Sequence, residues 1–148
     1  MSINFAGKVA IVTGAGNGLG RSHALALAKL GTKVVVNDLG GARDGSGASP
    51  QAADDVVALI ASNGGEAFAH GANVAKFDEV EDMVQQTMEK WGRVDILINN
   101  AGILRDKSFG KMDLDDFRLV VDVHLMGTVN CCKAVWDIMK QQEYGRIV

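Results

Sequence analysis

Short apolar runs alternate with helix-forming segments along the chain, and this alternation restricts its fold more than any other feature. We expect buried strands at the apolar runs, which lie at 8–13, 33–38, 66–70 and 94–99, with another opening at 147–148. Short strands that alternate with helices are typical of a parallel sheet with right-handed crossovers and helices on both faces. The alternation therefore predicts an α/β fold with a doubly wound parallel sheet of about five strands.

The segments between these runs have the composition or the periodicity of helices. Residues 19–30 and 51–62 are rich in strong helix formers, and glycines follow both segments as stop signals. Residues 114–139 are expected to be mostly helical, as one helix or as two with a bend near Gly127. The helix that ends before Gly92 is the clearest, because a mostly apolar face recurs at three- and four-residue steps: Val80, Met83, Val84, Thr87, Met88 and Trp91.

Composition limits the classes of partner. The chain has 148 residues, 47% of them hydrophobic and 22% charged, which is enough for one domain with a core. Its net charge of -3 gives no basic patch for nucleic acid. No run approaches the ~18 apolar residues of a membrane span, and the N-terminus lacks the pattern of a secretory signal. Adjacent Cys131 and Cys132 suit buried thiols better than a zinc site or a disulfide. We expect a soluble, intracellular protein with no nucleic-acid, membrane or metal partner.

A glycine-rich segment, 13–20, connects the first predicted strand to the first predicted helix. Helix N-termini present unpaired N–H groups and the positive end of the helix dipole to an anion. Glycines allow the backbone to turn sharply and to approach the pyrophosphate of a dinucleotide. Glycine patterns alone are common, but this one has the strand-turn-helix context that gives it meaning. It predicts a Rossmann-type dinucleotide site.

Asp38 ends the second predicted strand and bears on the choice of cofactor. A carboxylate at this place can accept hydrogen bonds from the adenosine ribose hydroxyls and would repel a 2′-phosphate. We therefore predict NAD as cofactor and NADP as the less favoured one, although Arg43 lies close enough in sequence to approach a 2′-phosphate. The alternative is that Asp38 only caps a turn with Gly40 and Gly41.

Two motifs together resemble the short-chain dehydrogenase/reductase family. The first is Thr13-Gly14-x-x-x-Gly18-x-Gly20, and the second is Asn99-Asn100-Ala101-Gly102. Further segments, at 36–41, 100–106 and 144–148, resemble the dehydrogenase domain of peroxisomal D-specific bifunctional enzymes and their bacterial relatives. That resemblance implies NAD-dependent oxidation of a (3R)-hydroxyacyl-CoA to the 3-oxo form. It also implies a homo-oligomer in the cytoplasm, or in the peroxisome of a eukaryote.

The resemblance implies a role in cofactor binding for one residue set: Gly14, Asn17, Gly18, Leu19, Gly20, Asp38, Asn73, Val74, Asn100, Ala101 and Gly102. For Asn99 we expect a structural role. His124 stands where the family usually has a catalytic Asn. It could bridge a water in a proton relay, or it could pack and bond a carbonyl, which we slightly prefer.

The family's catalytic Ser and Tyr-x-x-x-Lys groups have no counterpart before Val148, so we assign no catalytic residue. We expect residues 1–148 to form the N-terminal, cofactor-binding part of the domain and to be inactive alone. Tyr144 is expected to be a turn or packing residue. The polar loop at 40–50 is either a flexible surface loop or a lid.

Two other functions remain open at this point. A 3-oxoacyl-[carrier-protein] reductase belongs to the same class and would prefer NADPH. A non-catalytic dinucleotide-binding module belongs to a different class and would bind NAD without turnover.

Overall fold

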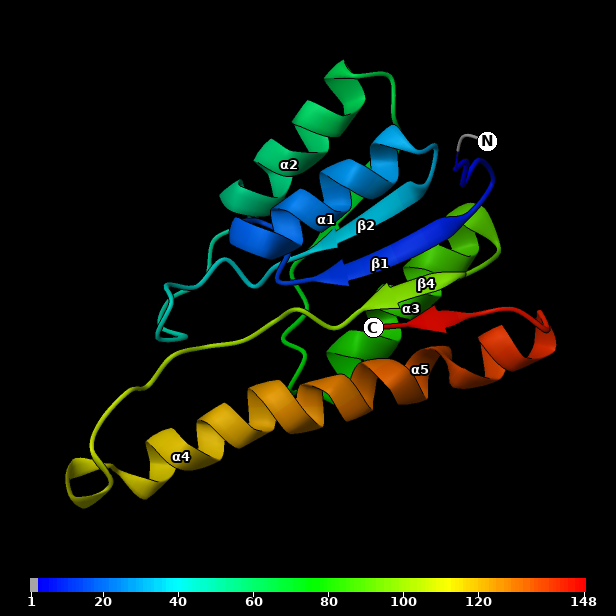
Figure 1. Cartoon of the computed structure of the whole chain (residues 1–148). Coiled ribbons are helices and arrows are strands. Elements are labelled where there is room, and N and C mark those ends of the chain that lie inside the picture. Colours follow the sequence, from blue (N-terminus) through cyan, green and yellow to red (C-terminus); the bar gives the residue numbers. More distant parts are fainter. Residues whose placement is uncertain (1–2) are drawn as a thin grey trace.

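The computed structural model, which describes residues 3–148, confirms the predicted doubly wound sheet. Its strands are all parallel and lie in the order β3-β2-β1-β4-β5 (Figure 1). Their bounds are β1 Val9–Thr13, β2 Lys33–Asn37, β3 Ala67–His70, β4 Ile96–Ile98 and β5 Arg146–Ile147. The order reverses direction between β1 and β4, and ligands of such sheets bind beside this point.

Helices cover both faces of the sheet (Figure 1). Helices α1 (Gly18–Lys29) and α2 (Gln51–Ser62) lie on one face, and α3 (Phe77–Trp91) and α5 (Gly127–Gln141) lie on the other. Helix α4 (Leu114–Val121) continues the line of α5 and extends beyond the sheet. The two faces therefore enclose two separate parts of the core.

Alternating side chains of the central strands fill these two parts, as expected for strands buried on both faces. Val34 and Val36 contact the side chains of α1 and α2, whereas Val35 lies in the cluster formed by α3 and α5. All three are fully buried. Because both faces are covered, the backbone ends of the strands are the places where this sheet can present polar groups.

The helix predicted at 114–139 differs from expectation in its detail. A π-helical segment, Asp122–Met126, joins α4 to α5, so the chain continues in one direction instead of breaking at Gly127. Gly127 is buried, and a Cβ atom there would lie 2.6 Å from Val74 Cγ2. The glycine is thus required for close packing of α5 against the segment after β3. A short 3₁₀ turn, Phe109–Lys111, precedes α4 and has no counterpart among the predicted elements.

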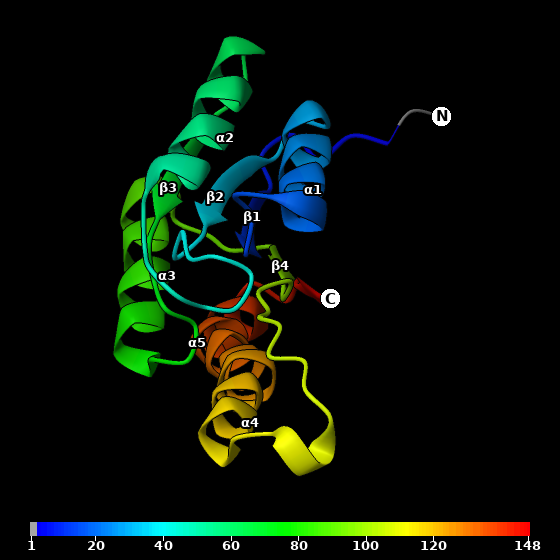
Figure 2. The same ribbon diagram turned by 90° about the vertical axis from the view of Figure 1, so that its left-hand side faces the viewer.

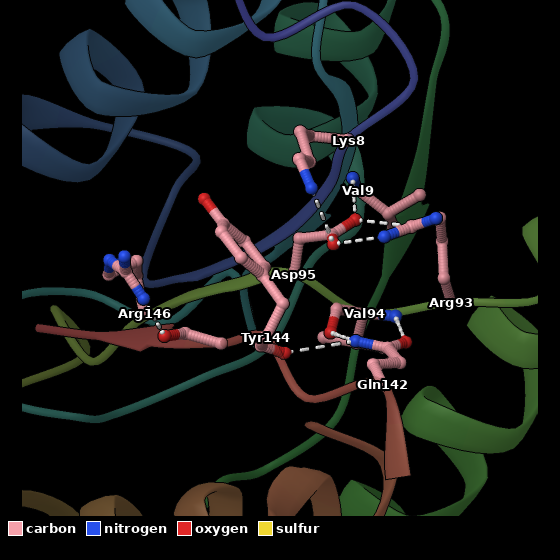
Figure 3. Close-up of polar contacts among 9 residues, drawn as sticks. Lys8, Val9, Arg93, Val94, Asp95, Gln142, Tyr144 and Arg146 are labelled. Carbon is pink, nitrogen blue, oxygen red and sulfur yellow. Dashed lines mark hydrogen bonds and ion pairs between the residues drawn. The ribbon is translucent and has the colours of Figure 1, made fainter. Parts of the chain in front are cut away.

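Polar side chains meet at the amino ends of β1 and β4 (Figure 3). The buried Asp95 carboxylate accepts hydrogen bonds from the Val9 N–H at 2.9 Å, from Lys8 Nζ at 3.4 Å, and from Arg93 Nε and Nη2 at 2.7 and 2.6 Å. Burial acts to raise the pKa of Asp95, but Arg93, the Val9 N–H and Lys8 together hold this pKa below its ordinary value. Asp95 is therefore a carboxylate whose charge is fully compensated inside the fold.

Tyr144 belongs to the same cluster (Figure 3). Its ring lies 3.7 Å from Lys8 Nζ and 4.8 Å from the Arg146 guanidinium carbon, measured to the ring centroid. Gln142 secures the adjoining turn, because its side chain bonds both the N–H and the carbonyl oxygen of Val94. These contacts agree with the packing role predicted for Tyr144.

Candidate functional site

A cleft of about 620 Å³ opens at the carboxyl ends of the strands. Figure 2 looks onto this edge of the sheet. The segments that follow β1, β2, β3 and β4 all contribute to the cleft, which places it at the point where the strand order reverses. Its volume lies within the range of small-molecule and cofactor sites.

The glycine loop forms one wall of the cleft. Gly14 has a φ of 60°, and a Cβ atom there would lie 2.9 Å from the Ala101 Cα atom. Gly18, with a φ of 55°, begins α1. None of the residues that the structure describes caps α1 with a side chain, and its first turn has no acidic residue. The N–H groups of that turn are thus free of protein anions, which fits an anionic ligand such as a pyrophosphate.

Asp38 lies in the cleft at the end of β2 and holds the surrounding backbone. One carboxylate oxygen accepts the Gly16 N–H at 2.8 Å, and the other accepts the Gly40 N–H at 2.7 Å. The turn contact proposed as an alternative for Asp38 is therefore present. Each oxygen retains a second lone pair, so the carboxylate can still accept a hydrogen bond from a hydroxyl group.

The segment after β3 forms the opposite wall. Asn73 and Val74 line the cleft, and both are held from outside it. Glu79 accepts the Asn73 N–H at 2.8 Å, and Asn130 of α5 donates to the Val74 carbonyl oxygen at 2.9 Å. The Asn73 N–H and the Lys76 ammonium hold the pKa of Glu79 below its ordinary value. An ionised Glu79 therefore fixes the position of Asn73.

Asn100 joins the ends of β1 and β4. Its Nδ2 donates to the carbonyl oxygens of Thr13 and Gly14, each at 3.0 Å. Thr13 completes the connection, because its Oγ1 accepts the N–H groups of Asn100 and Ala101 at 3.0 Å. Sequence reasoning did not assign this role to Thr13. Its only indication was the place of Thr13 at the end of a strand, directly before the glycines.

Nine of the eleven residues expected to bind cofactor line the cleft, and Leu19 and Gly20 do not. Leu19 is 73% exposed. Gly20 is buried in the structure, and a Cβ atom there would lie 2.2 Å from the Gly14 carbonyl oxygen and 2.4 Å from Asn100 Nδ2. Gly20 thus permits the close approach of α1 to the glycine loop.

Gly102 and the backbone of Ile103 meet His124 of the π-helical segment. A Cβ atom at Gly102 would lie 2.7 Å from His124 Cε1. His124 Nε2 lies 3.0 Å from the Ile103 nitrogen and 2.9 Å from its oxygen, and the tautomer decides which of the two it bonds. This geometry fits the packing role that we prefer for His124.

Asn99 faces away from the cleft. Its N–H donates to the Val148 carbonyl oxygen at 2.8 Å, and its Nδ2 lies 3.7 Å from Cys132 Sγ. Both contacts fit the structural role predicted for this residue.

Several further residues line the cleft that were not among the eleven expected to bind cofactor, including Leu39, Ala42, Ile103, Leu119 and Val123. Leu119 and Val123 come from the α4 side, so they reach the cleft only through tertiary packing. The loop at 40–50 also contributes to the cleft through Gly41, Arg43 and Gly45.

Metal and thiol chemistry have little support within residues 3–148. This part of the chain contains no group of three or more His, Cys, Asp or Glu side chains placed to hold a metal ion. Burial raises the pKa of the Cys131 thiol to about 12, which makes it a poor nucleophile. Across the same residues, no helix has both the length and the apolar character needed to cross a membrane.

Comparisons with known proteins agree with this geometry. The family model described as short chain dehydrogenase matches residues 8–148. Peroxisomal multifunctional enzyme A from Dictyostelium discoideum is 52% identical to this chain. The alignment covers the whole of this chain and 33% of that enzyme. A 3-oxoacyl-[acyl-carrier-protein] reductase from Synechocystis is 48% identical to this chain. That alignment covers 95% of this chain and 54% of the reductase.

Solved structures agree as well. A crystal structure of a short chain dehydrogenase from Mycobacterium avium superposes with a TM-score of 0.84 at 43% identity. The match covers 96% of this chain and 51% of that one. The chain thus spans about half the length of its bacterial relatives and a third or less of the first peroxisomal ones.

Proposed function

This chain belongs to the short-chain dehydrogenase family, and we propose that it forms the dinucleotide-binding part of an NAD-dependent oxidoreductase. Members of the family use nicotinamide dinucleotide cofactors. The observation that carries the proposal is the cleft at the strand-order reversal, which brings an uncapped helix N-terminus and a carboxylate together. The two groups suit the two polar parts of such a cofactor, its pyrophosphate and its ribose.

Each wall of the cleft has a proposed role in binding. The N–H groups of the first turn of α1, at 18–20, hold the pyrophosphate, and Asp38 accepts from the adenosine ribose. Asn73 and Val74 flank the adenine, while residues 100–102 border the nicotinamide ribose. A bound cofactor supplies the hydride acceptor. The chain's own residues bind it, orient it and exclude water from its edges.

Asp38 supports NAD over NADP. Its carboxylate is fixed by the Gly16 and Gly40 N–H groups, so it cannot move away easily from a 2′-phosphate. Such a phosphate would meet a negative charge held in place, which disfavours NADP. Arg43 lines the same cleft and is the group that would favour NADP, but it lies on a loop and not on the strand end.

The substrate proposed is a (3R)-3-hydroxyacyl-CoA, oxidised at its hydroxyl to the 3-oxo form. Support comes from the level of identity to the peroxisomal multifunctional enzymes and from the segments at 36–41 and 100–106. We propose that residues outside 1–148 supply proton transfer, because Tyr144 lies at the amino end of the sheet, away from the cleft. The 148 residues alone are then expected to bind cofactor without turnover.

Calorimetric titration of the 148-residue chain with NAD and with NADP tests the cofactor proposal. We expect saturable binding of NAD, and binding of NADP weaker by about 10-fold or more, since a fixed like charge costs at least ~1.4 kcal/mol. Equal binding of the two would reject the NAD assignment. Absence of binding by a chain that is folded by circular dichroism would reject the dinucleotide site.

Turnover tests the substrate proposal in a polypeptide that joins this chain to the catalytic half of a relative. Such a chimera is assayed with the (3R) and (3S) epimers of 3-hydroxybutyryl-CoA and NAD. Reduction of NAD with the (3R) epimer alone is expected. Activity with neither epimer, in a chimera that binds NAD, would reject the substrate and leave the cofactor assignment standing.

A second candidate is a 3-oxoacyl-[acyl-carrier-protein] reductase, favoured by the identity to the Synechocystis protein of that name. The two functions differ in the cofactor expected, and NADP binding tighter than NAD binding would favour the reductase. A non-catalytic dinucleotide-binding module would instead bind NAD but remain inactive in every chimera.

We also propose an assembly and a compartment. Large apolar side chains of α4, α5 and the segment between them are exposed, and they would be covered in a homo-oligomer: Leu114, Phe117, Leu125, Met126, Val129 and Trp136. The compartment proposed is the cytoplasm, or the peroxisome if the source is eukaryotic.

A further inference from the structure

The loop after β2 is attached to the segment after β4 on the far side of the cleft. The Leu104 N–H donates to the Arg43 carbonyl oxygen at 2.7 Å. A Cβ atom at Gly45 would lie 3.1 Å from Ile103 Cγ2, so the loop backbone packs directly on that side chain. Arg43, Gly45 and Ile103 all line the cleft. Figure 2 shows the loop passing beside the strand ends toward the segment after β4.

The loop is internally ordered, which lets it move as one body. The Ala42 N–H bonds the Ser46 carbonyl oxygen at 2.8 Å, and Asp44 Oδ1 accepts the Ser46 N–H at 2.9 Å and its hydroxyl at 2.6 Å. Gly40 and Gly47, with φ of 75° and 74°, lie on either side of this turn. These glycines are suited to absorb the backbone rotation of a moving loop.

Arg105 connects this turn to α4. Its Nε donates to the Asp44 carbonyl oxygen, and its Nη1 pairs with Asp116 Oδ1 at 2.6 Å. Asp116 also contacts Lys107 Nζ at 3.2 Å, and its side chain is only 15% exposed. The guanidinium is therefore oriented by a carboxylate on a helix and presents its Nε–H to the loop backbone. A planar, forked donor can make both contacts at once.

We propose that Arg105 is a positioning residue that latches the loop at 39–50 over the dinucleotide cleft, with Asp116 orienting it. The inference rests on the proposed function and adds the means by which the cofactor is retained. Release of NADH requires the latch to open, and because the latch is also closed in the cofactor-free chain, entry of NADH requires the same opening. The loop is then a lid, and not only a flexible surface loop.

Limited trypsin digestion of the cofactor-free chain tests the latch directly, because Arg43 lies within the loop. In Arg105→Ala we expect cleavage after Arg43, identified by mass, to be about 10-fold faster, as for loss of a charge-assisted hydrogen bond. Arg105→Lys keeps the charge beside Asp116 but lacks the forked guanidinium. Its rate of cleavage after Arg43 should therefore lie between those of the wild type and Arg105→Ala. Arg118→Ala is the matched control, since Arg118 pairs only with the exposed Asp115 on the same helix.

Stopped-flow fluorescence of NADH gives the second readout. Arg105→Ala should release NADH about 10-fold faster, and association should also become faster because the latch is closed in the cofactor-free chain. Asp116→Asn is a second variant for the case in which Arg105→Ala unfolds, and it should show the same direction of change. An unchanged cleavage rate after Arg43 in a folded Arg105→Ala or Asp116→Asn variant would overturn the latch.

The two proposals can fail separately. If the wild-type chain binds no NADH, the proposed function fails, while digestion of the cofactor-free chain still decides whether Arg105 holds the loop. If NADH binds and Arg105→Ala releases it at the wild-type rate, the latch is rejected and the function stands.

Discussion

The amino and carboxyl ends of β1 and β4 differ in how their polar groups are satisfied. At the amino ends the buried Asp95 is matched by Lys8, Arg93 and the Val9 N–H, all from within the chain. At the carboxyl ends, none of the described residues caps α1, and the cleft is lined by glycines and alanines together with polar and apolar side chains. The charged group at the amino ends has its partners within the chain, whereas the carboxyl ends leave N–H donors free for a ligand.

This difference shows how one sheet can serve two purposes. The two ends are separated by buried core residues, including Ile11 and Leu97, so the polar groups of one end do not contact those of the other. Ligand-binding sites leave some hydrogen-bonding groups without a protein partner, so the rest of the fold must supply the stability. Changes at the amino end are therefore expected to alter stability and not cofactor affinity, whereas changes at the cleft are expected to lower cofactor affinity with a smaller loss of stability.

The largest effect is expected from Asp95→Ala. Removal of the carboxylate leaves the Val9 N–H buried without its acceptor and two cations without their partner, which should lower the free energy of unfolding by about 3 kcal/mol. Urea denaturation measures this change. NAD affinity of the folded protein should remain within about twofold, or ~0.4 kcal/mol.

Asp115→Ala is the control for that experiment, because its exposed pair with Arg118 should contribute less than about 0.5 kcal/mol. If Asp95→Ala reduced NAD affinity more than it reduced stability, the proposed separation of the two ends would be wrong.

Asp38→Asn tests the other end of the sheet. An amide can accept only one of the two N–H groups that the carboxylate accepts, and it has no charge to offer a ribose. We expect NAD affinity to fall about 10- to 100-fold, with a loss of stability of about 1 kcal/mol. Calorimetric titration with NAD and NADP measures both affinities, and the preference for NAD should shrink.

Gln51→Ala provides a comparison nearby, since the Gln51 side chain donates from Nε2 to the exposed Asp55 side chain on the same helix. An Asp38→Asn variant that loses stability but retains full NAD affinity would show that Asp38 serves the turn alone.

Much of the fold could be predicted because each element carries its own local pattern. The helix expected at 51–62 is found at Gln51–Ser62, and the amphipathic face of α3 is buried as its spacing indicated. The strand expected at 94–99 is found at Ile96–Ile98, and Val94 is outside it because the Gln142 side chain takes both of its backbone groups. That contact joins distant parts of the chain and leaves no local trace in the sequence.

The residues of the site likewise include some that local sequence patterns predict and some that they do not. Residues directly after a strand, such as Asp38 and Asn73, could be placed at one edge because parallel strands end together. The roles of Thr13 and Arg105 could not be predicted, since each depends on contacts between remote segments. The charge of Asp95 within a buried apolar run was a local indication of the amino-end cluster, and sequence reasoning did not use it.

Acid should weaken the amino end of the sheet. Because the pKa of Asp95 is lowered in the folded state, its ionised form stabilises the fold above the unfolded-state pKa, and this contribution is lost as the pH falls toward the folded-state pKa. Asp95→Asn removes that dependence. The stability difference between wild type and this variant should be constant above about pH 5 and should shrink below about pH 4.

Urea denaturation at a series of pH values measures that difference, with Asp115→Asn as the control for general acid effects. A difference that stays constant down to about pH 3 would mean that Asp95 does not titrate as its surroundings indicate.

Tyr144→Leu is expected to have the smallest effect on stability. It tests whether the amino end of the sheet has only a structural role. The leucine removes the ring that faces Lys8 and Arg146, which should lower the free energy of unfolding by about 1 kcal/mol. Tyr144→Phe keeps the ring and should change it by less than about 0.5 kcal/mol, since no hydrogen bond of the hydroxyl to another described residue is present. Neither variant should change NAD affinity, or the activity of a chimera that carries a catalytic half. Loss of activity in Tyr144→Phe at unchanged stability would place the tyrosine hydroxyl in the chemistry, and the amino end of the sheet could no longer be regarded as purely structural.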